Sequence, residues 1–254
     1  MHVQLAPLRF ESFTPQHYGL LALFVVVFVA LVQHGRRHGD DERFRRRFAV
    51  AILCFTIPFQ TLQLLPSDFD LDTSLPLQYC DITWMAAVVA LWTRTWWAVA
   101  LTFFWGLTLT IQGAITPSLG QEFPDPRYFM YWGMHFLSVW AAGWLVGSGS
   151  RPGWRDYRLA VLVTATWAVT VMAFNGLTGT NYGYLNRKPP GASILDLLPG
   201  WPAYVLIEVV LVLAAWALLT WAFARAGSRP WIRSSSARGT GSAHHPTARG
   251  PKHP

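Results

Sequence analysis

The sequence predicts an all-α protein, a polytopic bundle of seven transmembrane helices. Hydrophobic residues make up 52% of the 254 residues and charged residues only 13%, whereas soluble domains carry about 25% charged residues. Apolar runs of about 18–22 residues recur along the chain, and about 20 helical residues cross the roughly 30 Å hydrocarbon core of a bilayer. Low charge and repeated runs of this length together favour a membrane protein over a soluble one.

Seven apolar runs are long enough to be spans. The first is expected to be retained, because it lacks the basic segment and the small-residue cleavage site of a signal peptide. The expected spans are residues 16–34, 47–65, 77–93, 95–115, 128–148, 158–178 and 202–224.

Lys and Arg residues set the expected orientation of the spans. One set of loops, together with the C-terminal tail, holds 16 of them and the other set holds 4. Cytoplasmic loops carry the excess of positive charge, so we expect the N-terminus outside and the C-terminus in the cytoplasm. The net charge of +7 then reflects membrane orientation. A nucleic-acid partner is not expected, because no basic face of a folded domain is indicated.

The chain divides into three expected regions. Residues 1–15 form a short outer N-terminal segment, and residues 16–227 form the seven-helix domain. Residues 228–254 are rich in Ser, Gly, Arg, Pro and His, a composition that cannot bury a core. We therefore expect a disordered, basic cytoplasmic tail.

The two cysteines are expected to be free thiols. Cys54 lies near the middle of the second span, and Cys80 lies near the outer end of the third. Their depths differ by more than the roughly 7 Å that a disulfide allows between Cα atoms. No Cys or His spacing typical of a metal site occurs, so we expect neither a metal nor a cofactor.

Polar residues gather in the outer half of the predicted bundle. Such residues are costly within a membrane and tend to face the bundle interior. A proton or ion path would need polar groups at successive depths, whereas a single layer favours a cavity open to the outer face or the outer leaflet. The residues of this layer are His17, Gln60, Cys80, Asp81, Gln112, His135, Asn175 and Glu208.

Each of these residues also has a structural interpretation. Cys80 can act as a small apolar side chain, His135 can bond between helices, and Asp81 can cap the third span. Together they fit a nucleophile, a base and an orienting group, with Cys80 and His135 as the catalytic candidates. Candidates for orienting His135 or binding an oxyanion are Asp81, Glu208, Gln112 and Asn175.

The outer loops supply further candidates. Residues 179–202 form an unusually long loop, and such loops often act as lids. Within it, Ser193 and Asp196 have the spacing of a capping box, which predicts one helical turn on the membrane surface. Tyr128 and Tyr131 fit an aromatic belt at the outer interface. Candidates for lining the cavity or the substrate loop are His17, Gln60, Asn181, Tyr184, Ser193 and Asp196.

Four segments together resemble one known family. They are "LPLQYCDI" at 75–82, "QGAITPSL" at 112–119, "MHFLSV" at 134–139 and "NYGYLNRKPPGASILDLLPGWPAY" at 181–204. In this order they resemble the bacterial YwaF-type integral membrane proteins, a family related to human transmembrane protein 164. The resemblance covers roughly residues 13–225. The ending "LLPGWPAY" departs from the form closer to "LGPWPWY" that the family leads us to expect.

This resemblance implies a chemistry and a location. The eukaryotic branch is described as a cysteine-dependent phospholipid acyltransferase, so Cys80 would match its nucleophile and His135 its base. A membrane lipid would then be the substrate, and the protein would be a multi-pass protein of the bacterial cytoplasmic membrane. Transfer and hydrolysis differ in whether a lipid alcohol or water receives the acyl group, and the sequence favours neither. Nor does it indicate an oligomeric state.

Two other functions remain open from sequence. A transporter or lipid-binding protein would use the same cavity without covalent chemistry. A scaffold protein would pair all of its polar residues between helices and leave no pocket.

Overall fold

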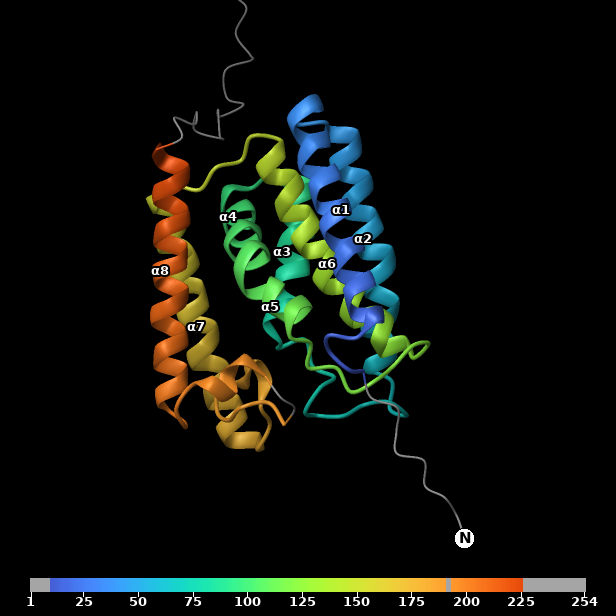
Figure 1. Cartoon of the computed structure of the whole chain (residues 1–254), viewed down its shortest axis with the longest axis vertical. Coiled ribbons are helices and arrows are strands. Elements are labelled where there is room, and N and C mark those ends of the chain that lie inside the picture. The colour runs from blue at the N-terminus through green and yellow to red at the C-terminus, as the bar shows by residue number, and fades with distance from the viewer. Residues whose placement is uncertain (1–9, 191–192, 226–254) are drawn as a thin grey trace, which may run out of the picture.

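The computed structural model describes residues 10–190 and 193–225, and all regular structure within these ranges is helical (Figure 1). The all-α prediction is therefore confirmed for the described part of the chain. The predicted tail at 228–254 and most of the predicted N-terminal segment lie outside the described residues.

Each of the seven predicted spans corresponds to one long helical segment. The fourth span is continuous but contains a π-helix, so it comprises α4, η1 and α5. Short 3₁₀ helices, η2 and η3, lie in the long loop before α8. The helices are α1 (Pro15–His38), α2 (Glu42–Gln63), α3 (Tyr79–Thr93), α4 (Trp96–Phe104), η1 (Trp105–Leu109), α5 (Thr110–Ile115), α6 (Pro126–Gly147), α7 (Trp154–Thr178), η2 (Tyr182–Tyr184), η3 (Ile194–Leu197) and α8 (Ala203–Arg225).

Four of these segments are long and apolar enough to cross a membrane on their own: Pro15–His38, Trp96–Ile115, Trp154–Thr178 and Ala203–Arg225. The apolar helix α3 has only 15 residues, because the chain before it forms turns rather than a further helical turn. The protein is thus a helical membrane protein with several apolar helices.

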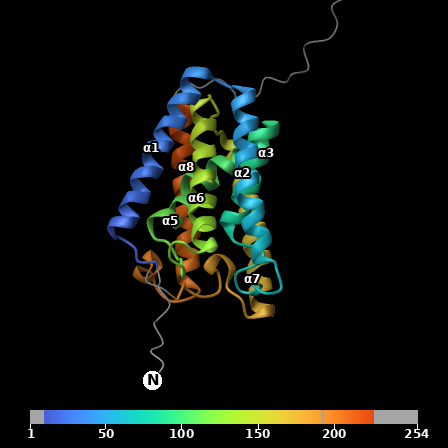
Figure 2. The same ribbon diagram turned by 90° about the vertical axis from the view of Figure 1, so that its right-hand side faces the viewer.

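The helices form a bundle around α3, α4 and α6 (Figures 1 and 2). Helices α1 and α2 pack against α6 on one side, and α7 packs against α4 on the other, with α8 beside α7. Helices α1, α3, α6 and α8 begin at the same end of the bundle, and α2, α5 and α7 finish there. We call this end the site end.

Two glycines of α6 allow α1 to lie against it. A Cβ atom on Gly147 would lie 2.3 Å from the carbonyl oxygen of Val32, and one on Gly143 would lie 2.5 Å from the ring of Phe28. Small residues commonly permit such close approach between membrane helices. The Gly143–Gly147 pair therefore serves packing within the chain.

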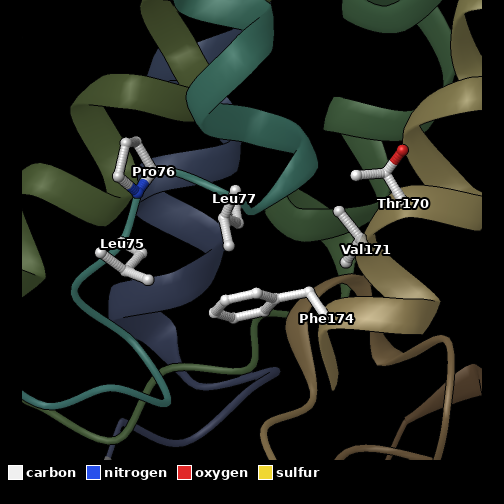
Figure 3. Close-up of a pocket in the computed structure, with 6 residues that line it drawn as sticks. All are labelled: Leu75, Pro76, Leu77, Thr170, Val171 and Phe174. Carbon is white, nitrogen blue, oxygen red and sulfur yellow. The ribbon is translucent and has the colours of Figure 1, made fainter. Parts of the chain in front are cut away.

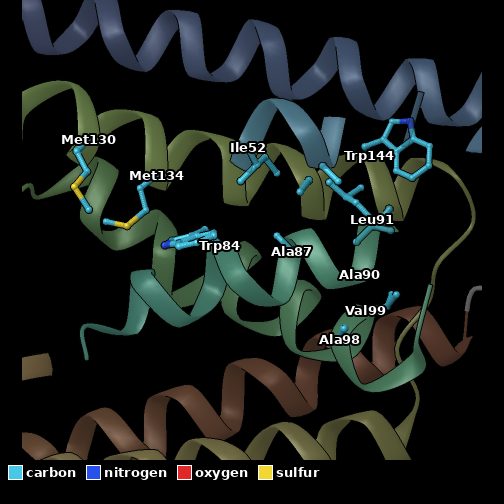
Figure 4. Packing of buried hydrophobic residues seen from close by; sticks show 13 residues of the cluster. Ile52, Trp84, Ala87, Ala90, Leu91, Ala98, Val99, Met130, Met134 and Trp144 are labelled. Atoms are coloured by element: carbon cyan, nitrogen blue, oxygen red, sulfur yellow. The ribbon is translucent and has the colours of Figure 1, made fainter. Parts of the chain in front are cut away.

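A buried cluster joins α2, α3 and α6 (Figure 4). Ala87 and Ala90 of α3 are fully buried there, and their small size lets Ile52 and Trp144 approach α3 from the two neighbouring helices. Cys80 packs against the same cluster. The core thus holds the helix that carries Cys80 firmly against α6.

An arginine fixes the other end of α3. The Nη1 atom of Arg45, from α2, donates to the carbonyl oxygens of Leu91 and Trp92 at 2.6 Å. These carbonyls belong to the last turn of α3, where no backbone partner is available. Asp40 lies 3.4 Å from both Arg45 and Arg94 and offsets part of their charge. The basic end of the bundle is therefore held by charge-assisted bonds.

Candidate functional site

Cys80 is the second residue of α3, so its sulfur lies at a helix N-terminus. The sulfur is close to the backbone N–H groups of Cys80 and Asp81. The carboxylate of Asp81, 5% exposed, accepts a hydrogen bond from the backbone N–H of Gln78 at 3.0 Å. Asp81 therefore caps α3, and Cys80 lies beside the N–H groups of the first turn.

His135 lies on α6 with one ring nitrogen engaged. Its Nδ1 atom is 2.7 Å from the carbonyl oxygen of Tyr131. Because a carbonyl oxygen can only accept, Nδ1 carries the proton and Nε2 carries a lone pair. In the described part of the chain Nε2 has no hydrogen-bond partner, and it is not among the fully enclosed polar atoms. His135 thus presents an unpaired lone pair at Nε2.

Gly113 of α5 provides the space for this ring. A Cβ atom at Gly113 would lie 2.3 Å from Nε2 of His135, a distance that no side chain can tolerate. The hydroxyl of Tyr131 donates to the carbonyl oxygen of Gly113 at 2.7 Å, and the Tyr131 and His135 rings lie 4.3 Å apart. The π-helix η1 directly precedes α5, and such bulges occur often at functional sites.

Two tyrosines lie near Cys80, and one of them, Tyr131, also contacts His135. The hydroxyl of Tyr131 lies within electrostatic range of the Cys80 thiol, and so does that of Tyr184 from the loop before α8. The Tyr184 hydroxyl also lies near the side chain of Ser118. Burial is the main reason that the pKa of Tyr184 is raised; nearby Cys80 also raises it, and the Ser118 side chain partly opposes the rise. Tyr184 therefore remains a neutral hydroxyl that can donate a hydrogen bond.

The loop carrying Tyr184 covers the start of α3. The backbone N–H of Gly183 donates to Oε1 of Gln78 at 2.9 Å, and the hydroxyl of Tyr182 donates to the carbonyl oxygen of Leu71 at 2.6 Å. Gly183 and Tyr184 both have positive φ, 67° and 54°. A non-glycine residue in this region is strained, and such strain tends to occur at functional sites.

His17, a cavity candidate, has both ring nitrogens engaged. Nδ1 accepts from the backbone N–H of Phe13 and Nε2 donates to the carbonyl oxygen of Ala114, each at 2.9 Å. The side chain is fully buried. His17 thus fastens the start of α1 to α5.

Asn175, an oxyanion candidate, holds the loop after α7. Its Nδ2 donates to the Tyr182 carbonyl at 2.9 Å and to the Asn186 side chain at 3.0 Å. Its Oδ1 accepts from Tyr182 N and the Thr180 hydroxyl, each at 2.9 Å. Asn175 therefore has no free N–H to offer a substrate. Asn181 makes a similar local bond, from Nδ2 to the Arg187 carbonyl at 2.8 Å.

The capping box predicted in this loop is confirmed. The backbone N–H of Ser193 donates to Oδ2 of Asp196 at 2.8 Å, and the Ser193 hydroxyl accepts from Leu195 N at 3.2 Å. These bonds start η3. On α2, Gln60 likewise has a structural contact, from Nε2 to the Ser74 carbonyl at 3.3 Å.

Several candidates are not joined directly. Within residues 10–190 and 193–225, no hydrogen bond links Cys80 to His135, and neither Asp81 nor Glu208 bonds or pairs with His135. Gln112 is exposed, and Glu208 is half-buried on α8, near Tyr204. The group that orients His135 is therefore the Tyr131 carbonyl.

Three residues at this site carried no functional signal in the sequence. Gly113 and Ser118 lie inside "QGAITPSL", so their motif was found but their roles were not. Tyr131 was interpreted as an interface aromatic. The contact between the Tyr131 carbonyl and His135 could not be predicted from the sequence, because every histidine within a helix has a backbone carbonyl four residues earlier. In the described part of the chain, no group of three His, Cys, Asp or Glu side chains could hold a metal ion.

One comparison with known proteins gives a match. A family model described as the TMEM164 family matches residues 12–220. The matched stretch begins before α1, ends within α8 and contains all of the residues discussed above. No curated protein and no solved structure matches the chain.

Proposed function

The chain belongs to the TMEM164 family, and from this premise we propose that it is a membrane enzyme that transfers or hydrolyses lipid acyl groups through Cys80. The observation that carries this proposal is the state of His135. Its Nε2 lone pair is held without a partner against Gly113. The Tyr131 ring contacts the His135 ring, and the Tyr131 hydroxyl lies within electrostatic range of the Cys80 thiol. His17, in contrast, has both ring nitrogens engaged.

The proposed reaction has two steps. In the first, His135 Nε2 takes the Cys80 proton as the sulfur attacks the carbonyl carbon of a lipid ester. The carbon–oxygen bond to the lipid breaks, and the departing oxygen takes the proton from His135. In the second, water or a lipid hydroxyl gives its proton to His135 and attacks the thioester, and Cys80 regains a proton as its sulfur leaves.

Two kinds of hydrogen-bond donor would stabilise the negative charge that develops on the carbonyl oxygen. The first is the backbone N–H groups at the start of α3, which point away from the helix. The second is the neutral Tyr184 hydroxyl, which lies near the thiol. Cys80 and His135 are not yet in hydrogen-bond contact, and catalytic contacts often tighten only when substrate binds.

We also propose an orientation and a location. The seven helical segments would all cross or enter the bilayer, with the N-terminus outside and the C-terminus in the cytoplasm. The exposed arginines at the end opposite the site, including Arg36, Arg37 and Arg47, support this orientation through the positive-inside rule. The site end would then face the outer leaflet of a bacterial cytoplasmic membrane, where the protein is multi-pass.

Lipid binding or transport without covalent chemistry is the second candidate function. The observation that favours it is the absence of a bond between Cys80 and His135 in the described structure. A binding protein would need the cavity but not the thiol.

Lipid turnover by two variants separates these functions. In the purified protein reconstituted with phospholipid, Cys80→Ser and His135→Ala are each expected to reduce lipid turnover to background, measured as lysolipid and acylated product by mass spectrometry. Cys54→Ser is the matched control, because Cys54 is an exposed thiol on α2, and it should retain full turnover. If both site variants turn over lipid at the wild-type rate, the enzyme proposal is wrong. Lipid transfer that survives them would favour the second function.

A further inference from the structure

An apolar groove lies beside the segment that leads into α3 (Figure 3). It has a volume of about 290 Å³ and lies between this segment and the last part of α7. Its lining residues are Leu75, Pro76, Leu77, Thr170, Val171 and Phe174.

The lining offers no polar partner to a ligand. The Thr170 hydroxyl, the one polar side-chain group of the lining, donates to the Thr166 carbonyl at 2.8 Å within α7. The Leu77 carbonyl accepts from Nε1 of Trp167 at 3.2 Å. Water in a cavity needs two to four polar partners, so the groove favours hydrocarbon over water.

The groove adjoins an exposed apolar surface of α7. On this helix Val169 is 68% exposed and Leu177 is 88% exposed, and α7 is long and apolar enough to cross a membrane. Exposed apolar side chains on such a helix contact lipid chains. The occupant can therefore enter from the surrounding bilayer without crossing water.

The groove also lies close to the candidate nucleophile. Leu77 precedes Cys80 by three residues, so their Cα atoms are at most about 11 Å apart, given 3.8 Å between consecutive Cα atoms. A lipid ester placed at the thiol would thus have the groove within reach of its acyl chain.

We propose that this groove binds one acyl chain of a membrane phospholipid and so places its ester carbonyl at Cys80. This inference rests on the proposed function, because it specifies the lipid chain that the same site would receive. The groove is then the feature that selects a long hydrocarbon chain over a short or polar one.

Photo-crosslinking tests this proposal in the full-length protein. The protein is reconstituted in nanodiscs with phosphatidylcholine that carries a diazirine in one acyl chain, and labelled peptides are identified by mass spectrometry after illumination. Labels are expected to concentrate on residues 75–77 and 170–174. The exposed α8 residues Val209–Leu211 give the background level of labelling. If residues 75–77 and 170–174 are labelled no more strongly than this background, the groove does not bind an acyl chain.

A matched pair of variants sharpens this test. Thr170 and Thr166 are both exposed and lie one turn apart on α7, and each hydroxyl bonds the carbonyl four residues earlier. Thr170→Trp should fill the groove and reduce its labelling at least about fivefold, whereas Thr166→Trp should leave it unchanged. Equal effects of the two substitutions would contradict the proposal.

The experiments distinguish failure of the proposed acyl-chain binding from failure of the proposed catalysis. Cys80→Ser should keep groove labelling and lose turnover. Lipid turnover without groove labelling would contradict only the proposal that the groove binds an acyl chain. Groove labelling in a wild-type protein that shows no lipid turnover would contradict the proposed enzyme activity. It would also contradict the proposed placement of a lipid ester at Cys80.

Discussion

Replacing His135 with glutamine is expected to slow acylation of Cys80 by about 10²–10⁴-fold, the usual contribution of a general base. The glutamine amide can still donate to the Tyr131 carbonyl, as Nδ1 of His135 does at 2.7 Å. It has no basic lone pair to replace Nε2. The loss is therefore chemical rather than structural, and the measurement is the rate at which the reconstituted protein gains acyl mass.

His17→Gln is the matched control for this prediction. His17 is also buried at the site end, but both of its nitrogens are bonded to the backbone. The substitution should lower the melting temperature and leave the acylation rate of the folded protein within about threefold of wild type, because His17 takes no part in proton transfer. If His17→Gln and His135→Gln slow acylation equally, His135 is not the base.

Substituting Gly113 with alanine is expected to cause a similar loss while leaving every reacting group in place. The added methyl would lie 2.3 Å from Nε2 of His135, so the ring must move away from its position beside Tyr131. A displacement of about 1 Å can cost about 10²-fold in rate. The variant should bind lipid but acylate Cys80 at least about 100-fold more slowly.

Gly176→Ala controls for the general effect of replacing a helical glycine. Gly176 lies within α7, and a Cβ there would meet nothing within 4 Å. Alanine is favoured over glycine in a helix by about 1 kcal/mol, so this variant should be at least as stable as wild type and fully active. Wild-type acylation by a folded Gly113→Ala protein would mean that the ring position does not matter.

Most of the fold could be predicted from the sequence, because the position of each helix follows from local sequence features. The apolar runs marked all seven helical segments, and the spacing of Ser193 and Asp196 marked the capping box of η3. The π-helix within the fourth segment was not predicted. This segment packs against α3 and α6, and an apolar run alone does not distinguish a π-helix from an α-helix.

The candidate site was predictable only in part. The position of Cys80 at a helix start and the apolar surroundings of His135 both followed from local sequence. The orienting group did not, because a backbone carbonyl rather than Asp81 or Glu208 holds the ring. The placement of Tyr184 near Ser118 and within electrostatic range of the thiol depends on how two distant loops meet at the site end, which no local pattern reveals.

The most direct test is the mass of Cys80 itself. The protein is incubated with phospholipid in nanodiscs, quenched at low pH to preserve thioesters, digested and analysed by mass spectrometry. The proposed mechanism predicts a fatty-acyl mass on the peptide that contains Cys80, removed by hydroxylamine and absent from Cys54. An unmodified Cys80 under conditions in which the same protein turns over lipid would contradict the acyl-cysteine mechanism.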